Sequence, residues 1–230
     1  MTIVNSTHKF IFVHVPKTAG TSVKQHLRFY AGETDIYVFE HKSKEGPASR
    51  ARASLKKHST AMEIRHAVGS ETFESFFKFC VVRNPFARAI STYRFLKYKF
   101  REWPKSGIMD ECRSLEDFVV SDFFRSPGPG GIFRPQVRWL ENGRGDLSMD
   151  YICRLESLET DLSAVRRQLS LADPSAFVGK KNVSGGDLSD ISAGLQSGVV
   201  VEIIRKRYAR DFDLLKYSTE PGEELLRGPE

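Results

Sequence analysis

The stretch that decides the fold is Phe10-Ile-Phe-Val-His-Val-Pro-Lys-Thr-Ala-Gly-Thr-Ser22. Its first half, Phe10 to Val15, is apolar and rich in β-branched residues, and only His14 interrupts it, which is typical of a strand buried on both faces. We interpret His14 as a core histidine. Pro16 has no N–H to give to a strand ladder, so the strand should end there. The sequence therefore predicts an early buried strand that leads directly into a turn.

The turn and the helix start after this strand together predict an anion site. Residues Lys17 to Gly20 form the turn, and Thr21 or Ser22 can cap the helix. The first N–H groups of a helix have no internal partner and carry about half a positive charge between them. Lys17 adds a full charge, and hydroxyl donors come from Thr18, Thr21 and Ser22. We therefore predict a phosphate-binding loop here.

A second stretch repeats this architecture. Phe76 to Val82 has the pattern of another buried strand and Arg83 follows it, while Asn84 is a natural N-cap and Pro85 a natural first helical residue. Ligands of parallel α/β sheets bind at the carboxyl ends of the strands. The fold class predicted from the two units is α/β, a single P-loop-like domain with a central parallel β-sheet flanked by helices.

The remaining elements are expected from caps and hydrophobic periodicity. Residues 1–7 have the composition of a polar lead-in, and the last stretch, 219–230, that of a frayed tail. The other expected elements are a strand at Ile36–Phe39, a helix capped by Ser59 or by a Thr60–Glu63 capping box and ending near Gly69, a helix over Pro85–Phe100, a helix starting at Ser114-Leu-Glu-Asp117, a helical turn at Gln136–Leu140, a strand at Asp150–Leu155, a helix over Leu158–Leu171, an extended segment at Phe177–Ser184 and a helix over Val199–Phe212.

Length and composition indicate one globular domain over residues 1–230, or one domain with an inserted subregion. Hydrophobic residues make up 40% and charged residues 28% of the chain, which is ordinary for a protein with a real core. The formal net charge of +6 suits an anionic ligand, but it does not establish a nucleic-acid partner, and we expect none.

Compartment and metal content can also be predicted. No apolar run approaches the roughly 20 residues that a membrane span needs, and the start lacks the pattern of a signal peptide, so we expect no membrane insertion. Cys80, Cys112 and Cys153 are odd in number and widely spaced, which favours buried thiols over a disulfide framework or a zinc site. We expect a reducing, cytoplasmic setting.

Two features argue against a metal-dependent ATPase or kinase. The P-loop of those enzymes places its Lys directly before a Ser or Thr at the helix start, whereas Lys17 precedes Gly20 here. Those enzymes hold Mg²⁺ with an Asp at a strand end, whereas the predicted strand Phe76–Val82 is followed by Arg83. A P-loop nucleotide or small-molecule kinase and a non-catalytic nucleotide-binding module remain the alternative functions.

The two phosphate motifs resemble those of a known family. Pro16-Lys-Thr-Ala-Gly-Thr-Ser22 resembles the 5′-phosphosulfate loop of sulfotransferases that use 3′-phosphoadenosine 5′-phosphosulfate (PAPS), and Val82-Arg-Asn-Pro-Phe-Ala-Arg-Ala-Ile-Ser91 resembles their 3′-phosphate motif. The closest subgroup is the family-2, carbohydrate-type sulfotransferases, including bacterial members. The resemblance extends to His58-Ser-Thr-Ala, Arg154-Leu-Glu-Ser-Leu158, Lys181-Asn-Val-Ser184 and Tyr208-Ala-Arg-Asp211.

The resemblance implies transfer of a sulfuryl group from PAPS, without a metal, to a hydroxyl or amine of a carbohydrate or small-molecule acceptor. Lys17 would stabilise the leaving charge, and His58 would act as catalytic base, with Glu63 as the alternative. The 3′-phosphate would contact Arg83, whose planar fork suits phosphate, and Ser91. The expected nucleotide-binding residues are Lys17, Thr18, Ala19, Gly20, Thr21, Ser22, Arg83, Ser91, Lys181 and Asn182.

Several roles stay open at this level. Lys181 and Asn182 can close over the nucleotide or form a solvated turn. Arg88 is interpreted as a third phosphate contact or, preferably, as a surface residue. Gln136 and Trp139 are candidates to line the acceptor pocket. Residues 41–57 and 101–135 are expected to contain acceptor-side loops, and within them the Gly- and Pro-rich segment 126–131 is either a connector or a mobile lid.

Overall fold

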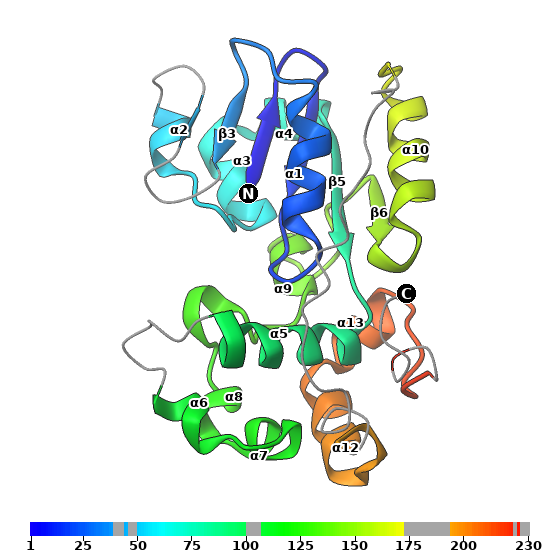
Figure 1. Ribbon diagram of the computed structural model, residues 1–230. Coiled ribbons are helices and arrows are strands. Elements are labelled where there is room, and N and C mark those ends of the chain that lie inside the picture. The colour runs from blue at the N-terminus through cyan, green and yellow to red at the C-terminus, as the bar shows by residue number, and fades with distance from the viewer. Residues whose placement is uncertain (39–43, 46–49, 100–106, 173–193, 223–224, 226–230) are drawn as a thin grey trace. The chain divides into compact units, whose positions relative to one another are not determined.

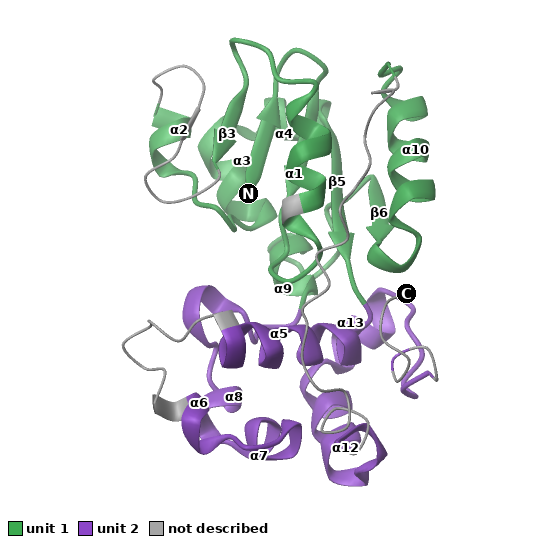
Figure 2. Cartoon of the chain, in the orientation of Figure 1, with its two compact units in different colours: residues 1–83, 136–181 green, residues 84–135, 182–230 purple. Residues whose placement is uncertain are grey.

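The computed structural model of the chain describes residues 1–38, 44–45, 50–99, 107–172, 194–222 and 225. The chain forms two compact units, and each contains two separate stretches of sequence (Figure 2). Unit 1 consists of Met1–Arg83 and Gln136–Lys181, and unit 2 of Asn84–Pro135 and Asn182–Glu230. The expectation of one domain over residues 1–230 stays a prediction.

Unit 1 is built on a sheet of six described strands in the order β4-β3-β1-β2-β5-β6 (Figure 1). The strands β2, β5 and β6 are parallel, whereas β1 pairs antiparallel with both β2 and β3, and β3 pairs antiparallel with β4. The strands are β1 (Thr2–Asn5), β2 (Phe10–Val13), β3 (Ile36–Val38), β4 (Lys44–Glu45), β5 (Phe77–Val82) and β6 (Tyr151–Arg154).

The predicted α/β class is confirmed, with two differences in the sheet. The parallel part is limited to β2, β5 and β6, so the sheet is mixed instead of wholly parallel. The expectation of a polar lead-in at residues 1–7 is wrong, because β1 lies inside the sheet. Its polar residue Asn5 is fully buried, and the side chain donates to the Tyr30 carbonyl at 2.9 Å and to the Asp35 carboxylate at 2.6 Å. These bonds offset the cost of burying an amide.

Helices of unit 1 lie on both faces of the sheet (Figure 1). Val23 and Leu27 of one helix and Leu162 and Val165 of another join a buried cluster with aromatic side chains of β2 and β5. The alternate β5 residue Lys78 points to the other face, where its ammonium lies 5.5 Å from the centre of the Phe73 ring. The helices are α1 (Gly20–Arg28), α2 (Arg50–Ser54), α3 (Ala61–Val68), α4 (Ser70–Ser75), α9 (Val137–Leu140), the 3₁₀ helix η2 (Leu155–Ser157) and α10 (Leu158–Gln168).

Unit 2 is helical in its described part. Its core contains aromatic rings from several helices, with Phe118 packed edge-on against Phe124 and Phe133 at ring distances of 5.0 and 5.6 Å. The elements are α5 (Pro85–Lys99), α6 (Gly107–Glu111), α7 (Leu115–Val120), α8 (Asp122–Arg125), the 3₁₀ helix η1 (Pro129–Gly131), α12 (Gly198–Arg207) and α13 (Ala209–Leu214).

Two arginines of unit 2 hold the Gly- and Pro-rich segment. Arg88 is 1% exposed and donates to the carbonyls of Arg134 and Ile132 at 3.0 and 2.9 Å. Arg207 donates to carbonyls of residues 125, 126 and 133. Arg88 is therefore a buried structural residue, and its interpretation as a surface residue is wrong. The segment is tied down on both sides, as expected of a connector.

Local signals predicted most helix ends correctly. Capping boxes form at Thr60 with Glu63 and at Ser114 with Asp117. The expectation that Thr21 or Ser22 caps α1 is wrong, because the helix begins at Gly20 and its N-cap, Ala19, makes no side-chain cap bond. The helix expected over 199–212 is two helices, α12 and α13, that meet at Tyr208. The extended segment expected at 177–184 lies outside the described residues.

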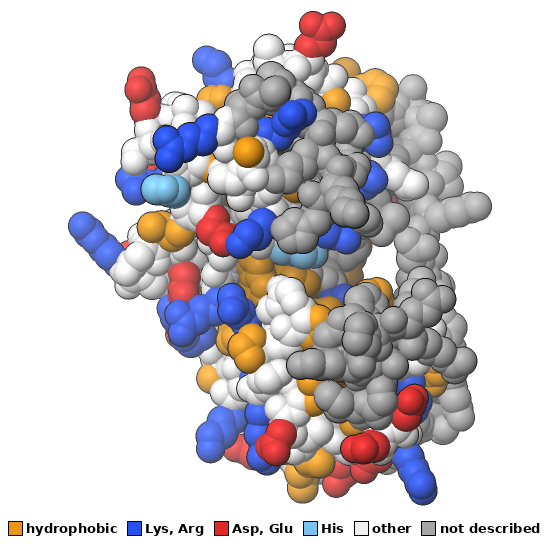
Figure 3. Space-filling view, turned by 90° about the vertical axis from the view of Figure 1, so that its left-hand side faces the viewer, with side chains coloured by type: hydrophobic (Ala, Val, Ile, Leu, Met, Phe, Trp, Pro, Cys, Tyr) orange, Lys and Arg blue, Asp and Glu red, His pale blue; other side chains and the backbone are white. Residues whose placement is uncertain are grey.

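Lys and Arg side chains are distributed among Asp and Glu side chains on the face drawn in Figure 3, without a single dominant patch. Within the part of the chain that the structure describes, no helix is long and apolar enough to cross a bilayer.

Candidate active site

The predicted phosphate loop connects β2 to α1. Lys17 and Ala19 both adopt left-handed backbone conformations, with φ of 70° and 57°. Such conformations are costly for residues other than glycine and gather at functional sites. They also turn backbone N–H groups into a concavity that suits an anion. Thr21 and Ser22 lie in the first turn of α1, whose N-terminal N–H groups lack helical partners. The loop thus has the geometry of an anion site.

Thr18 holds this loop from the inside. Its side chain is fully buried, and its hydroxyl donates to the carbonyl of Val15 at 2.9 Å. That proton is therefore already engaged within the protein. The group of Thr18 that fits a role toward an anion is its backbone N–H.

His14 packs against the start of α1. A Cβ built on Gly20 would lie 2.1 Å from Nε2 of His14 and 2.5 Å from its Cε1, so only glycine fits beneath the ring. Nδ1 of the same ring contacts the Met1 amine. Burial, followed by the charges of that amine, His58 and Lys57, holds the pKa of His14 well below its ordinary value. His14 is thus a neutral, buried histidine, as predicted, and it contacts the phosphate loop directly.

His58 lies beside His14. Their ring centres are 4.3 Å apart, and Nδ1 of His58 is 3.1 Å from the backbone carbonyl of His14. A carbonyl oxygen only accepts hydrogen bonds, so Nδ1 carries the proton in this contact. In this tautomer the lone pair of the neutral ring lies on Nε2, and Nε2 can accept a proton from another group. This geometry suits a general base.

The segment that carries His58 is anchored on β1. The hydroxyl of Thr2 accepts from the N–H of Ser59 at 3.2 Å and lies 3.4 Å from the carbonyl of Lys57. The hydroxyl of Ser59 in turn accepts from the N–H of Lys56 at 2.9 Å. The strand that the sequence analysis missed therefore positions the candidate base.

Glu63, the alternative base, is engaged in the capping box. Its Oε2 accepts from the N–H of Thr60 at 2.8 Å, and its Oε1 lies 3.7 Å from Nζ of Lys56. Both carboxylate oxygens thus have partners at the start of α3. This arrangement gives Glu63 a structural task that the sequence also predicted.

Arg83 follows β5 at the same edge of the sheet as the loop. The register pairs Val13 of β2 with Cys80 of β5, so both chains leave the sheet at similar heights on neighbouring strands. The buried amide of Gln136 holds the backbone of Arg83 at both groups: the Arg83 N–H donates to Oε1 at 2.9 Å, and Nε2 donates to the Arg83 carbonyl at 2.7 Å. Gln136 thus positions Arg83.

One further cation at this edge was not assigned a role from the sequence. Arg154 ends β6 opposite Val82, so Lys17, Arg83 and Arg154 follow the carboxyl ends of the three parallel strands. The backbone N–H of Arg154 donates to the Asp161 carboxylate at 2.7 Å. The signal available in the sequence was a basic residue near the end of the strand expected at Asp150–Leu155.

The other predicted residues do not belong to this cluster in unit 1. Ser91 is half-buried on α5 of unit 2. Lys181 and Asn182 lie outside the described residues. Trp139 is 3% exposed and buried in unit 1, and Gln136 is occupied with Arg83.

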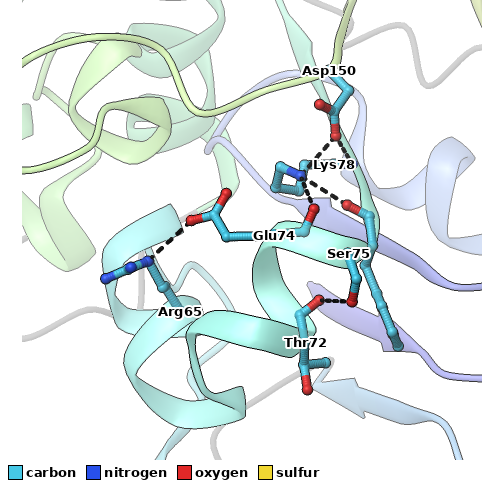
Figure 4. Close-up of polar contacts among 7 residues, drawn as sticks. Arg65, Thr72, Glu74, Ser75, Lys78 and Asp150 are labelled. Atoms are coloured by element: carbon cyan, nitrogen blue, oxygen red, sulfur yellow. Dashed lines mark hydrogen bonds and ion pairs between the residues drawn. The ribbon is translucent and has the colours of Figure 1, made fainter.

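A cavity of about 620 Å³ lies at the opposite, amino-terminal edge of β5 and β6. At its wall the Lys78 ammonium, on a side chain that is 8% exposed, pairs with Asp150 at 2.9 Å and donates to the Phe76 carbonyl at 2.8 Å (Figure 4). Arg65 pairs with Glu74 at 3.2 Å in the same view. These charges neutralise one another away from the phosphate loop, so we assign the cavity no part in the chemistry.

An anion loop and two arginines at the carboxyl edge of an α/β sheet, with a buried histidine and His58 beside the loop, form an arrangement that suits a phosphorylated ligand. Comparison with known sequences gives the family: residues 1–218 match the Sulfotransferase family, and the chain belongs to it. The resemblance drawn from the two phosphate motifs is thereby confirmed.

Two known proteins are similar in sequence to the chain. The chain is 33% identical over 183 residues to a protein of Danio rerio named carbohydrate sulfotransferase 14, covering 71% of this chain and 46% of that protein. It is 25% identical over 120 residues to an uncharacterized protein of Archaeoglobus fulgidus, covering 49% of this chain and 83% of that protein. The chain thus spans about half the length of the zebrafish protein. No solved structure matches the chain.

Proposed function

We propose that this protein is a sulfotransferase that moves a sulfuryl group from PAPS to a hydroxyl or amine of a carbohydrate or small-molecule acceptor. The observation that carries the proposal is the pairing, in one unit, of a Lys-containing anion loop with a histidine whose Nδ1 proton is held by a carbonyl. Membership of the Sulfotransferase family supports the sulfuryl group as the group transferred.

The reaction is an in-line displacement at sulfur. The acceptor oxygen or nitrogen forms a bond to sulfur while the bond from sulfur to the bridging oxygen of PAPS breaks, and His58 Nε2 takes the acceptor proton. Negative charge develops on the bridging oxygen, and Lys17 stabilises it. A well-placed donor of this kind lowers a barrier by about 3 kcal/mol. The leaving group is adenosine 3′,5′-bisphosphate.

The donor nucleotide is held at two ends in this proposal. The N–H groups of the loop from Lys17 to Ser22, with the hydroxyls of Thr21 and Ser22, bind the 5′-phosphosulfate, and Arg83 with Ser91 binds the 3′-phosphate. Lys181 and Asn182, which lie outside the described residues, are included as further nucleotide contacts. The Glu63 carboxylate is engaged at the start of α3, which favours His58 as the base.

Carbohydrate is the acceptor class that we favour, because the zebrafish relative is named a carbohydrate sulfotransferase. Transfer of radiolabelled sulfate from PAPS to a panel of glycans and small hydroxyl compounds tests the activity. Lys17→Ala should lower turnover by at least 100-fold while the affinity for adenosine 3′,5′-bisphosphate changes little. Lys206→Ala, at an exposed lysine of α12, serves as the matched control.

A second measurement separates the alternatives. In a thermal-shift assay, stabilisation by adenosine 3′,5′-bisphosphate without Mg²⁺ supports the proposal, whereas stabilisation by ATP–Mg²⁺ alone favours a kinase. Arg83→Ala should weaken binding of the bisphosphate, and Arg144→Ala, at an exposed arginine of the same unit, should not. Nucleotide binding without sulfate transfer to any acceptor would indicate a non-catalytic binding module.

A further inference from the structure

We propose that His14 is a positioning residue that couples the phosphate loop to the base His58. The role of His58 as a base rests on the proposed function, whereas the coupling of the loop to the His58 ring through His14 does not. His14 lies between the two parts of the site: its ring packs on Gly20 on one side and on the His58 ring on the other. Any displacement of the loop is therefore transmitted to the base through one rigid imidazole.

The His14 ring packs against Gly20 at the start of α1. Nε2 of His14 occupies the space that a Cβ of residue 20 would need, with a separation of 2.1 Å where real Cβ atoms have more than 3.0 Å. The His14 ring therefore fills the space beside the start of α1 that a side chain at position 20 would need. Gly20 at the start of α1 thus fixes one side of the ring.

The contact with the base has two components. The ring of His14 lies tilted against that of His58, with 4.3 Å between centres and 32° between the ring planes, and the backbone carbonyl of His14 accepts a hydrogen bond from Nδ1 of His58 at 3.1 Å. One residue thus sets both the orientation of the base and its tautomer. Because the proton is fixed on Nδ1, the lone pair is presented by Nε2.

The geometry also explains why a histidine stands at position 14 of an otherwise apolar stretch. A leucine or phenylalanine would fill the volume, but the imidazole edge additionally offers Nδ1 to the Met1 amine while Nε2 faces Gly20. The ring thus has a polar partner at Nδ1 and packs against Gly20 at its Nε2 edge. A ring held in this way can keep the neighbouring His58 in one orientation.

The test measures the tautomer of His58 directly. Long-range ¹H–¹⁵N spectra of the wild-type protein should show the neutral His58 ring protonated at Nδ1. In Gly20→Ala the new methyl must displace the His14 ring. The His58 ring should then become a mixture of both tautomers. Because the proposed coupling involves no bond between residue 20 and His58, this change would be transmitted through His14. His14→Ala keeps the backbone carbonyl that accepts from Nδ1 of His58 but removes the ring that holds His58 against it, so the His58 ring can rotate away from the carbonyl and the same change is expected.

Matched controls separate coupling from general damage. Gly198→Ala adds a Cβ that meets nothing within 4 Å and should leave the His58 signals unchanged, as should His8→Ala at an exposed histidine. Circular dichroism of every variant checks that it is folded, and His14→Phe, which keeps an aromatic ring, provides a second variant if His14→Ala does not fold. An unchanged Nδ1–H tautomer in folded Gly20→Ala and folded His14 variants would overturn the inference.

Kinetics give the second readout. If the proposed function is correct, His14→Phe and His14→Ala should lower kcat for sulfate transfer by 10-fold or more while KM for PAPS rises less than threefold. Unchanged kcat in these variants contradicts a positioning role. If the wild-type protein transfers no sulfate, the proposed function fails, but the tautomer experiment still decides whether His14 couples the loop to His58.

Discussion

At the scale of single residues, the site depends on side chains that hold other groups in place. Thr18 closes the loop through Val15, and Gln136 grips the backbone of Arg83 with both ends of its amide. None of these contacts follows from residue type or spacing, because each joins positions through the folded backbone. The sequence predicted the loop and Arg83, but not the groups that position them.

Substitution of Gln136 tests whether its amide holds Arg83 in place. Gln136→Ala leaves the N–H and the carbonyl of Arg83 without these partners, and an unsatisfied buried group costs about 1–3 kcal/mol, so the free energy of unfolding should fall by about 2 kcal/mol or more. Binding of adenosine 3′,5′-bisphosphate should weaken as well. Urea titration and calorimetry measure the two effects.

Two variants serve as references for Gln136→Ala. Gln136→Glu can still accept from the Arg83 N–H but cannot donate to its carbonyl, so its loss of stability should be intermediate. Gln168→Ala, at an exposed glutamine near the end of α10, should change little. If Gln136→Ala is as stable as the wild type, the amide does not hold Arg83 in solution.

At the scale of elements, the two capping-box signals predicted the starts of their helices, whereas the single-residue cap expected for α1 did not form. Thr60 with Glu63 and Ser114 with Asp117 begin their helices as predicted, because a capping box is encoded within four consecutive residues. The strand β1 was missed because Thr2–Asn5 is short and polar at both ends, and its burial depends on partners such as Tyr30 and Asp35 far along the chain. Pairing of β1 with β2 and β3 therefore decided the structure of this stretch against its polar composition.

The two capping boxes allow a matched comparison. Replacement of either N-cap residue by Ala should lower the free energy of unfolding by about 1 kcal/mol. Only Thr60→Ala should also lower sulfate transfer, because Thr60 lies two residues after His58, whereas Ser114 caps α7 in unit 2. Thr60→Ser should preserve both properties. Equal transfer rates in Thr60→Ala and Ser114→Ala would contradict a role of this cap in placing His58.

At the scale of the whole molecule, the buried His14 predicts a pH dependence of stability. An unfolded histidine titrates near pH 6.5, whereas burial, with the Met1 amine, His58 and Lys57 nearby, holds the pKa of His14 well below that in the folded protein. Between these values the unfolded chain binds a proton that the folded chain does not. The free energy of unfolding should therefore fall as the pH falls below 6.5, by up to about 1.4 kcal/mol per pH unit.

Urea unfolding at pH 7.5, 6.0 and 5.0 measures this dependence. His14→Phe lacks the titrating ring, so the difference between wild type and variant reports the contribution of His14 together with that of the Met1 amine, which contacts the ring and whose pKa burial lowers to about 3. The stability of the wild type should decrease more steeply on acidification. Parallel curves for the two proteins would show that His14 is not buried in its neutral form.

The two stretches that make up unit 1 have a consequence for the order in which the protein folds. Residues 1–83 leave the ribosome long before Gln136 and β6, yet the Arg83 backbone is held by Gln136 and β5 pairs with β6. The carboxyl edge of the sheet therefore cannot be completed until more than half of the chain has been synthesised. Until then the nascent chain exposes the β6-facing side of β5, an open strand edge of the kind that chaperones protect.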